Sequence, residues 1–159
     1  MQSFNKDNIF RSLLSDIKKA SRQKAHKNRK LQNICELLQA RVSYYNWVGF
    51  YLVDSASRQE LVLGPYVGEP TEHSRIPFGK GICGQAASQE KTFIVQDVSK
   101  ENNYLSCSLD VKSEIVVPIF KNGKIIGELD IDSHDLEPFD ENDNRFLDKV
   151  CGFVSIILG

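Results

Sequence analysis

Two apolar runs joined by Lys121-Asn-Gly-Lys124 place the strongest constraint on how this 159-residue chain can fold. An Asn-Gly pair between such runs predicts a β-hairpin, because both central positions of its turn favour positive φ. With the turn centred on Asn122 and Gly123, the expected pairing places Glu114 nearly opposite Ile131. The end of the second strand is therefore expected to lie beside Glu114.

Three carboxylates gather at the open end of this predicted hairpin. Residues two apart on a strand share a face, so Asp130 and Asp132 point the same way, and Glu114 lies beside them. The polar loop that carries Cys107 leads into the same end. Like charges repel unless a cation lies among them, so an amine of a ligand or a metal ion would complement the cluster. The alternative is that these strand-end acids are simply solvated.

Composition narrows the function without defining it. The chain has 41% hydrophobic and 26% charged residues, as expected for one globular domain of this length. A net charge of −1 gives no electrostatic reason to expect nucleic acid or a membrane as partner. The N-terminus lacks the apolar core of a signal peptide, and no apolar run reaches the length of a transmembrane helix. We therefore expect a cytoplasmic protein.

Four widely spaced cysteines offer different environments. No CxxC pair is present, which argues against a structural zinc site, and we expect no metal. Cys35 and Cys151 fall on apolar helical stripes and are expected in the core. Cys107 lies in a polar loop, which favours a chemical role. Cys83 follows Gly81 at the start of a short helix, whose dipole favours the thiolate, although a buried packing role is the alternative.

Periodicity gives the remaining elements. Apolar residues at helical spacing predict helices over 7–23 and 31–42 and a final helix capped by Asp140. The basic stretch 22–30 between the first two helices is expected to be a solvated connection, with a binding role as the alternative. The loop 65–81 is rich in Pro and Gly and contains a histidine.

An aromatic run over 45–53 predicts a strand, and 60–65 its hairpin partner. Trp47 and Tyr51 share one face of the first strand, opposite the apolar side chains that we assign to the core. We expect this aromatic pair to face a pocket, the alternative being that it packs beneath a loop. The order of elements predicts an α+β fold with a central, mainly antiparallel sheet flanked by helices.

Five segments together resemble the GAF-domain free methionine-(R)-sulfoxide reductases. They are Trp47-Val-Gly-Phe-Tyr51, Glu60-Leu-Val-Leu-Gly-Pro65, Arg75-Ile-Pro-Phe-Gly-Lys-Gly-Ile-Cys83-Gly84, Ser113-Glu-Ile-Val-Val-Pro118 and Gly127-Glu-Leu-Asp-Ile-Asp-Ser133. The resemblance implies a single GAF domain over 1–159 with an α/β/α sandwich. Its parts would be N-terminal helices in 1–43, the sheet and active-site loops in 44–138, and a C-terminal helix in 139–159.

The same resemblance implies an activity. Cys107 occupies the position of the catalytic cysteine, which would reduce free L-methionine-(R)-sulfoxide to methionine and become a sulfenic acid. Members of the family usually have a resolving cysteine where this chain has His73. We assign resolution to Cys83, giving a Cys83/Cys107 disulfide. His73 is then a plain surface residue, a base near the reactive thiol, or a sign of lost activity.

Substrate-site residues also follow from the resemblance. Glu114, Asp130 and Asp132 match the acids that would hold the ammonium of a free amino acid, and Glu114 is further assigned a catalytic role in proton supply. Trp47 and Tyr51 match the aromatic residues that would hold the sulfur and methyl group.

Partners follow in the same way. The resemblance implies no prosthetic cofactor, an external dithiol such as thioredoxin as reductant, and a homodimer. Two other functions remain open: a non-enzymatic GAF module that binds a small molecule or senses redox state, and a thiol switch without a small-molecule substrate.

Overall fold

The computed structural model describes residues 5–105 and 108–159, so the predicted catalytic Cys107 lies outside the described residues. The described residues form a sheet of six strands with the spatial order β3-β2-β1-β6-β5-β4, in which every neighbouring pair is antiparallel. The strands are β1 (Trp47–Val53), β2 (Glu60–Val67), β3 (Arg75–Pro77), β4 (Phe93–Val95), β5 (Ser113–Lys121) and β6 (Lys124–Ser133). The predicted α+β class and antiparallel sheet are confirmed.

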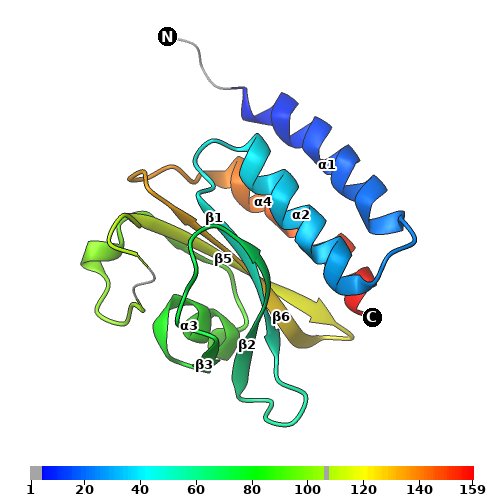
Figure 1. Cartoon of the computed structure of the whole chain (residues 1–159). Coiled ribbons are helices and arrows are strands. Elements are labelled where there is room, and N and C mark those ends of the chain that lie inside the picture. The colour runs from blue at the N-terminus through cyan, green and yellow to red at the C-terminus, as the bar shows by residue number, and fades with distance from the viewer. Residues whose placement is uncertain (1–4, 106–107) are drawn as a thin grey trace.

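Helices cover both faces of this sheet (Figure 1). On one face lie α1 (Lys6–Arg22), α2 (Lys27–Arg41) and α4 (Glu141–Leu158), whose apolar side chains form one core cluster with the sheet. On the other lie α3 (Gly81–Gln89) and the loops around it, which close a second apolar cluster. A short 3₁₀ turn, η1 (Val98–Lys100), follows β4. None of the helices in the described part of the chain has the length and apolar character needed to cross a membrane.

The β5–β6 hairpin forms as predicted at its turn but not along its whole length. Asn122 and Gly123 both adopt positive φ, and Lys121 pairs with Lys124. A register shift follows between Ile119 and Phe120. Because of this irregularity, Glu114 lies opposite Asp132 rather than nearly opposite Ile131, so the predicted register was wrong by one residue at the end that carries the acids.

The helix boundaries differ most from expectation in the basic stretch. The second helix begins at Lys27 instead of residue 31, because the His26 side chain accepts a hydrogen bond from the Asn28 amide at its N-terminus. Only 23–26 connects the two helices. The prediction of a connection over 22–30 was therefore too long, although 23–29 is exposed as expected.

A buried carboxylate fixes the start of α4 against the rest of the fold. Asp143 is fully buried and accepts hydrogen bonds from the hydroxyls of Tyr44 and Tyr45, at 2.7 and 2.8 Å. Its other oxygen accepts from Lys6 Nζ at 2.7 Å and from the Asp140 amide at 3.0 Å. Asp140 caps the helix as predicted. The network joins α1, α4 and the segment before β1.

Two of the four cysteines lie where helical periodicity placed them. Cys35 on α2 and Cys151 on α4 are buried in the core cluster of the helical face. Burial raises the pKa of each thiol far above its ordinary value. Their predicted place in the core is confirmed.

Candidate active site

On the face of the sheet that packs against α3, the predicted site residues of β1, β5 and β6 lie close together and form one block. Across the β1–β6 and β5–β6 ladders, Trp47 lies opposite Asp132, which in turn lies opposite Glu114. Two residues along β6, Asp130 lies between Gly49 and Val116. The period of two along each strand thus brings the predicted acids and aromatics together.

These acids are inside the protein, not at a solvated strand end. Glu114 is 6% exposed, and Asp130 and Asp132 are each 2% exposed. Burial raises the pKa of Asp130 and Asp132, and the charge of Asp130 raises that of Asp132 further. The alternative of solvated acids is therefore wrong. Buried carboxylates that repel one another retain protons or attract a cation.

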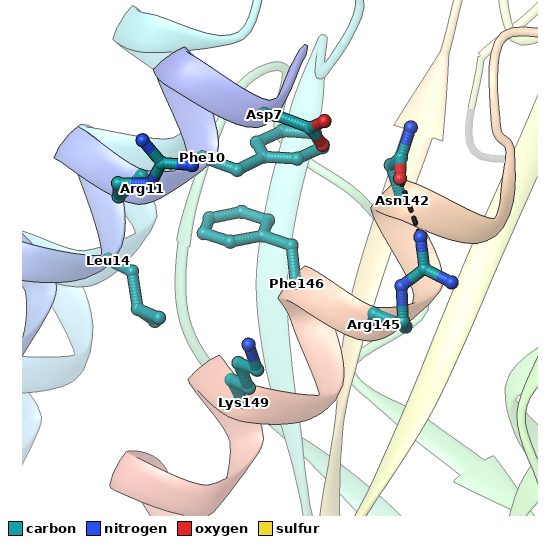
Figure 2. Close-up of a pocket in the computed structure, with 8 residues that line it drawn as sticks. All are labelled: Asp7, Phe10, Arg11, Leu14, Asn142, Arg145, Phe146 and Lys149. Carbon is teal, nitrogen blue, oxygen red and sulfur yellow. Dashed lines mark hydrogen bonds between the residues drawn. The ribbon is translucent and has the colours of Figure 1, made fainter.

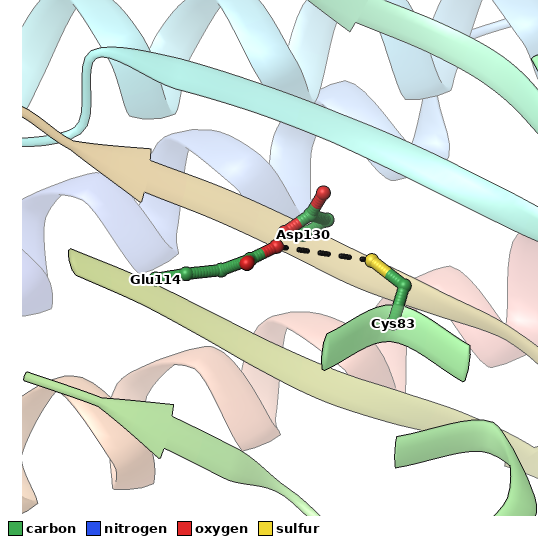
Figure 3. Close-up of side chains that lie close together, drawn as sticks. All are labelled: Cys83, Glu114 and Asp130. Carbon is green, nitrogen blue, oxygen red and sulfur yellow. Dashed lines mark hydrogen bonds between the residues drawn. The ribbon is translucent and has the colours of Figure 1, made fainter. Parts of the chain in front are cut away.

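Cys83 faces the carboxylates from the first turn of α3 (Figure 3). Its thiol is buried and donates to Glu114 Oε2 at 3.9 Å. Burial, followed by the charges of Asp130 and Glu128, raises the pKa of this thiol well above its ordinary value. The sequence-based expectation of a thiolate favoured by the helix dipole was wrong, because desolvation and carboxylate charges outweigh the dipole.

A fourth carboxylate, Glu128, was missed by sequence reasoning. It is fully buried on the same face of β6 as Asp130, opposite Tyr51. Among the described residues, neither of its oxygens has a hydrogen-bond partner of good geometry. The nearby donor is the Cys83 thiol, which lowers the pKa of Glu128 against the larger rise caused by burial. Alternation along β6 could have identified it, since residues 128, 130 and 132 share a face.

The two aromatic residues line this block and also hold the loop above it. Trp47 and Tyr51 are buried, with ring centroids 6.5 Å apart. Trp47 Nε1 donates to the Glu69 carbonyl at 2.9 Å, and the Tyr51 hydroxyl donates to the His73 carbonyl at 2.8 Å. The segment 68–74 between β2 and β3 is thus fixed over the site through its backbone, whereas the predicted loop 65–81 is interrupted by β3. The aromatic pair faces away from the helical core as predicted.

Two small cavities touch the acids. One, of about 10 Å³, is lined by Cys83, Glu114 and Asp130 together with His73 and Leu105. The other, of about 50 Å³, is lined among others by Trp47, Asp132 and Ser108. Leu105 and Ser108 are the described residues that flank Cys107 in the sequence. The loop predicted to carry the catalytic thiol therefore meets both cavities at its described ends.

A different hollow lies on the helical face, between α1 and α4 (Figure 2). It measures about 230 Å³, and Phe10 and Phe146 stack within it with centroids 4.2 Å apart. Arg11, Arg145 and Lys149 contribute cations to its rim. Among the described residues, no cysteine and none of the predicted site residues lines it, so the α3 face is the candidate active site.

Comparisons with known proteins place the chain in a family. The GAF domain model matches residues 29–158. GAF domain-containing protein A of Dictyostelium discoideum is 42% identical over 92% of this chain and 90% of its own length. The free methionine-R-sulfoxide reductase of Saccharomyces cerevisiae is 45% identical over 69% of this chain and 61% of its own. The structure of free methionine-R-sulfoxide reductase from Neisseria meningitidis in complex with its substrate superposes with a TM-score of 0.91 at 37% identity, covering 99% of this chain and 92% of that one.

Proposed function

The chain belongs to the GAF-domain family and, within it, to the free methionine-R-sulfoxide reductases, and we propose that it reduces free L-methionine-(R)-sulfoxide to methionine with cysteine thiols. The observation that carries the proposal is the block of buried carboxylates beside a buried aromatic pair. Glu114, Asp130 and Asp132 suit the ammonium of a free amino acid, which a methionine residue within a protein lacks.

Trp47 and Tyr51 are proposed to hold the other end of the substrate. Trp47 lies directly opposite Asp132, so a ligand whose ammonium meets that carboxylate has its side chain beside the indole. Aromatic rings make favourable contacts with sulfur and with methyl groups. The charged and apolar ends of methionine sulfoxide thus match two adjacent parts of one surface.

The chemistry is assigned to Cys107 and Cys83. The Cys107 thiolate attacks the sulfoxide sulfur while Glu114, in its protonated form, supplies a proton to the sulfoxide oxygen. The oxygen passes to Cys107 as a sulfenic acid and methionine leaves. The Cys83 thiol then attacks this sulfenic acid, water departs, and a Cys83/Cys107 disulfide remains. An external dithiol such as thioredoxin reduces that disulfide and regenerates both thiols.

Cys83 is suited to remain a protonated thiol while Cys107 reacts with the sulfoxide. Its raised pKa keeps it protonated beside Glu114 and Glu128, so it does not compete with Cys107 for the sulfoxide. His73 lines the cavity that holds Cys83, and we propose that Cys83 alone takes the resolving role that relatives give to a cysteine at position 73.

We further propose a single GAF domain over the whole chain, assembled as a homodimer and working without a prosthetic cofactor in the cytoplasm. Three free cysteines among the described residues suit a reducing compartment.

The decisive feature of this proposal is recognition of the free ammonium. Turnover of L-methionine-(R)-sulfoxide should exceed that of its N-acetyl derivative by more than about a hundredfold in kcat/KM, because acetylation removes the charge that the carboxylates bind. Methionine release with dithiothreitol as reductant measures both. Equal turnover of the two compounds would contradict the proposed site.

A further inference from the structure

Cys83, Glu114 and Asp130 also form a cluster of possible metal ligands (Figure 3). One donor atom from each residue, a thiol sulfur and two carboxylate oxygens, lies within 4.8 Å of the others. All three side chains are buried.

The cavity that these donors help to line has room for a single ion. The cavity they line measures about 10 Å³, which is room for one water-sized sphere. Exposed Lys80 lines the same cavity, so it extends toward the surface. The wall also includes Ile76, Ile82 and Leu105, so a cation that binds there must lose most of its water shell.

Glu128 provides an independent reason to place positive charge here. This carboxylate is fully buried, its oxygens lack well-formed hydrogen bonds among the described residues, and it acts on the thiol of Cys83. Asp130 Oδ1 is likewise without a partner. A buried carboxylate without donors is costly, and a bound cation removes that cost.

The donor types indicate which cation. Thiolate sulfur with carboxylate donors suits zinc and its heavier congener cadmium, whereas magnesium and calcium prefer oxygen donors only. Donor atoms of a tetrahedral zinc site lie about 3.5 Å apart, given metal–ligand bonds of about 2.0–2.3 Å. Cys83 Sγ and Glu114 Oε2, at 3.9 Å, need little movement to meet that spacing.

We propose that Cys83, Glu114 and Asp130 bind a thiophilic divalent cation, Zn²⁺ in particular, with a water molecule as the fourth ligand. The metal site rests on the described geometry alone. Competition between the metal ion and the substrate rests on the proposed function, because the same acids are assigned to the substrate ammonium. Zn²⁺ would thus inhibit the reductase reversibly, without redox change, by occupying the acids and holding Cys83 as a bound thiolate.

A titration with Cd²⁺ alone tests the site without using activity. In the fully reduced, chelator-treated protein, Cd²⁺ should produce the ultraviolet charge-transfer band of a cadmium thiolate at one equivalent. Cys83→Ser should abolish the band, and Asp130→Asn should weaken binding by more than about tenfold, since each removes one of few ligands. Cys107→Ser and the core control Cys35→Ser should retain it. No band in the wild type, or a band that Cys107→Ser abolishes and Cys83→Ser retains, would overturn the site.

Competition separates the metal site from the proposed function. Free L-methionine, which carries the ammonium but no reducible oxygen, should weaken Cd²⁺ binding as its concentration rises, and Zn²⁺ should raise KM while leaving kcat unchanged. A Cys83-dependent band that methionine does not affect would uphold the metal site and contradict the placement of the ammonium. Inhibition by Zn²⁺ that persists unchanged in Asp130→Asn would contradict the metal site.

Discussion

Glu114 on β5 lies directly opposite Asp132 on β6, and both side chains are buried on the face of the sheet that meets α3. Directly opposite residues on antiparallel strands have Cβ atoms about 4.5–5.5 Å apart, so two ionised carboxylates would repel one another here. The pKa of Asp132 is raised by burial and by the charge of Asp130. At this pair, either one carboxyl group keeps its proton or a cation lies near the two carboxylates. The proposed reductase mechanism uses the proton for the sulfoxide oxygen and the negative charge for the substrate ammonium.

Glu114→Gln tests that pair. The amide retains the size of the side chain but can neither give up a proton nor carry charge, so we expect kcat to fall by about 10²–10⁴-fold. Circular dichroism should show an intact fold. The exposed Glu101→Gln is the matched control and should leave kcat unchanged. An unchanged kcat in Glu114→Gln would remove this residue from the mechanism.

Buried Glu128 predicts an unusual dependence of stability on pH. Its folded-state pKa lies well above that of the unfolded chain, mainly because of burial, with Asp130 adding to the effect. Between these two pKa values the folded protein binds more protons than the unfolded chain, so its contribution to stability is complete below about pH 4 and is lost as pH rises through the folded pKa. Thermal unfolding of Glu128→Gln from pH 5 to pH 9 should show a smaller loss of stability with pH than wild type, whereas Glu101→Gln should follow wild type.

Gly49 is predicted to set the position of the indole. A Cβ built there would come within 2.7 Å of Trp47 Cζ3 and 2.8 Å of Tyr66 Cβ, so Gly49→Ala must displace the ring. Because Trp47 is the only tryptophan, its fluorescence spectrum reports the displacement directly. We expect a spectral shift and a higher KM.

Gly152 is the matched control for that substitution. It lies inside α4, and a Cβ there would meet nothing within 4 Å. Gly152→Ala should leave the fluorescence unchanged and increase the free energy of unfolding by about 0.5–1 kcal/mol, because alanine favours the helix. An unchanged spectrum in Gly49→Ala would show that the indole is not held by this contact.

Substitution of Asp143 is predicted to lower the free energy of unfolding more than other substitutions on the helical face. Asp143→Ala removes the acceptor of two tyrosine hydroxyls and leaves the Lys6 ammonium, which is largely buried, without this carboxylate. Loss of one partner from such a network costs about 3–5 kcal/mol in the free energy of unfolding. Urea denaturation of Asp143→Ala and of the exposed Asp148→Ala on the same helix measures the difference. Similar midpoints for the two variants would contradict the role given to the network.

Much of the fold could be predicted because local signals were strong. The Asn122-Gly123 turn, the apolar stripes of α1 and α4, and the cap at Asp140 each follow from short-range chemistry, and each is confirmed. The register at Glu114 could not be predicted, since the irregularity between Ile119 and Phe120 has no local turn signal. Helix α2 began early because His26 acted as its cap, a role that is uncommon for histidine.

The grouping of the proposed site residues was easier to predict than their electrostatics. Alternation placed Asp130 with Asp132 on one face of their strand and Trp47 with Tyr51 on one face of another, and the structure confirms both pairs. The environment of Cys83 depends on what α3 packs against, which a helix-start argument does not contain. Its thiol meets carboxylates from β5 and β6, so its pKa rises instead of falling. Tertiary packing decided that outcome.

The most direct test of the account is methionine production from free L-methionine-(R)-sulfoxide by the wild type, Cys107→Ser and Cys83→Ser, with dithiothreitol and with thioredoxin as reductants. We predict turnover by the wild type with both, none by Cys107→Ser, and a Cys83→Ser variant that is impaired mainly with thioredoxin, because the disulfide that thioredoxin reduces cannot form. Absence of turnover by the reduced wild type with either reductant, or full turnover by Cys107→Ser, would contradict the account.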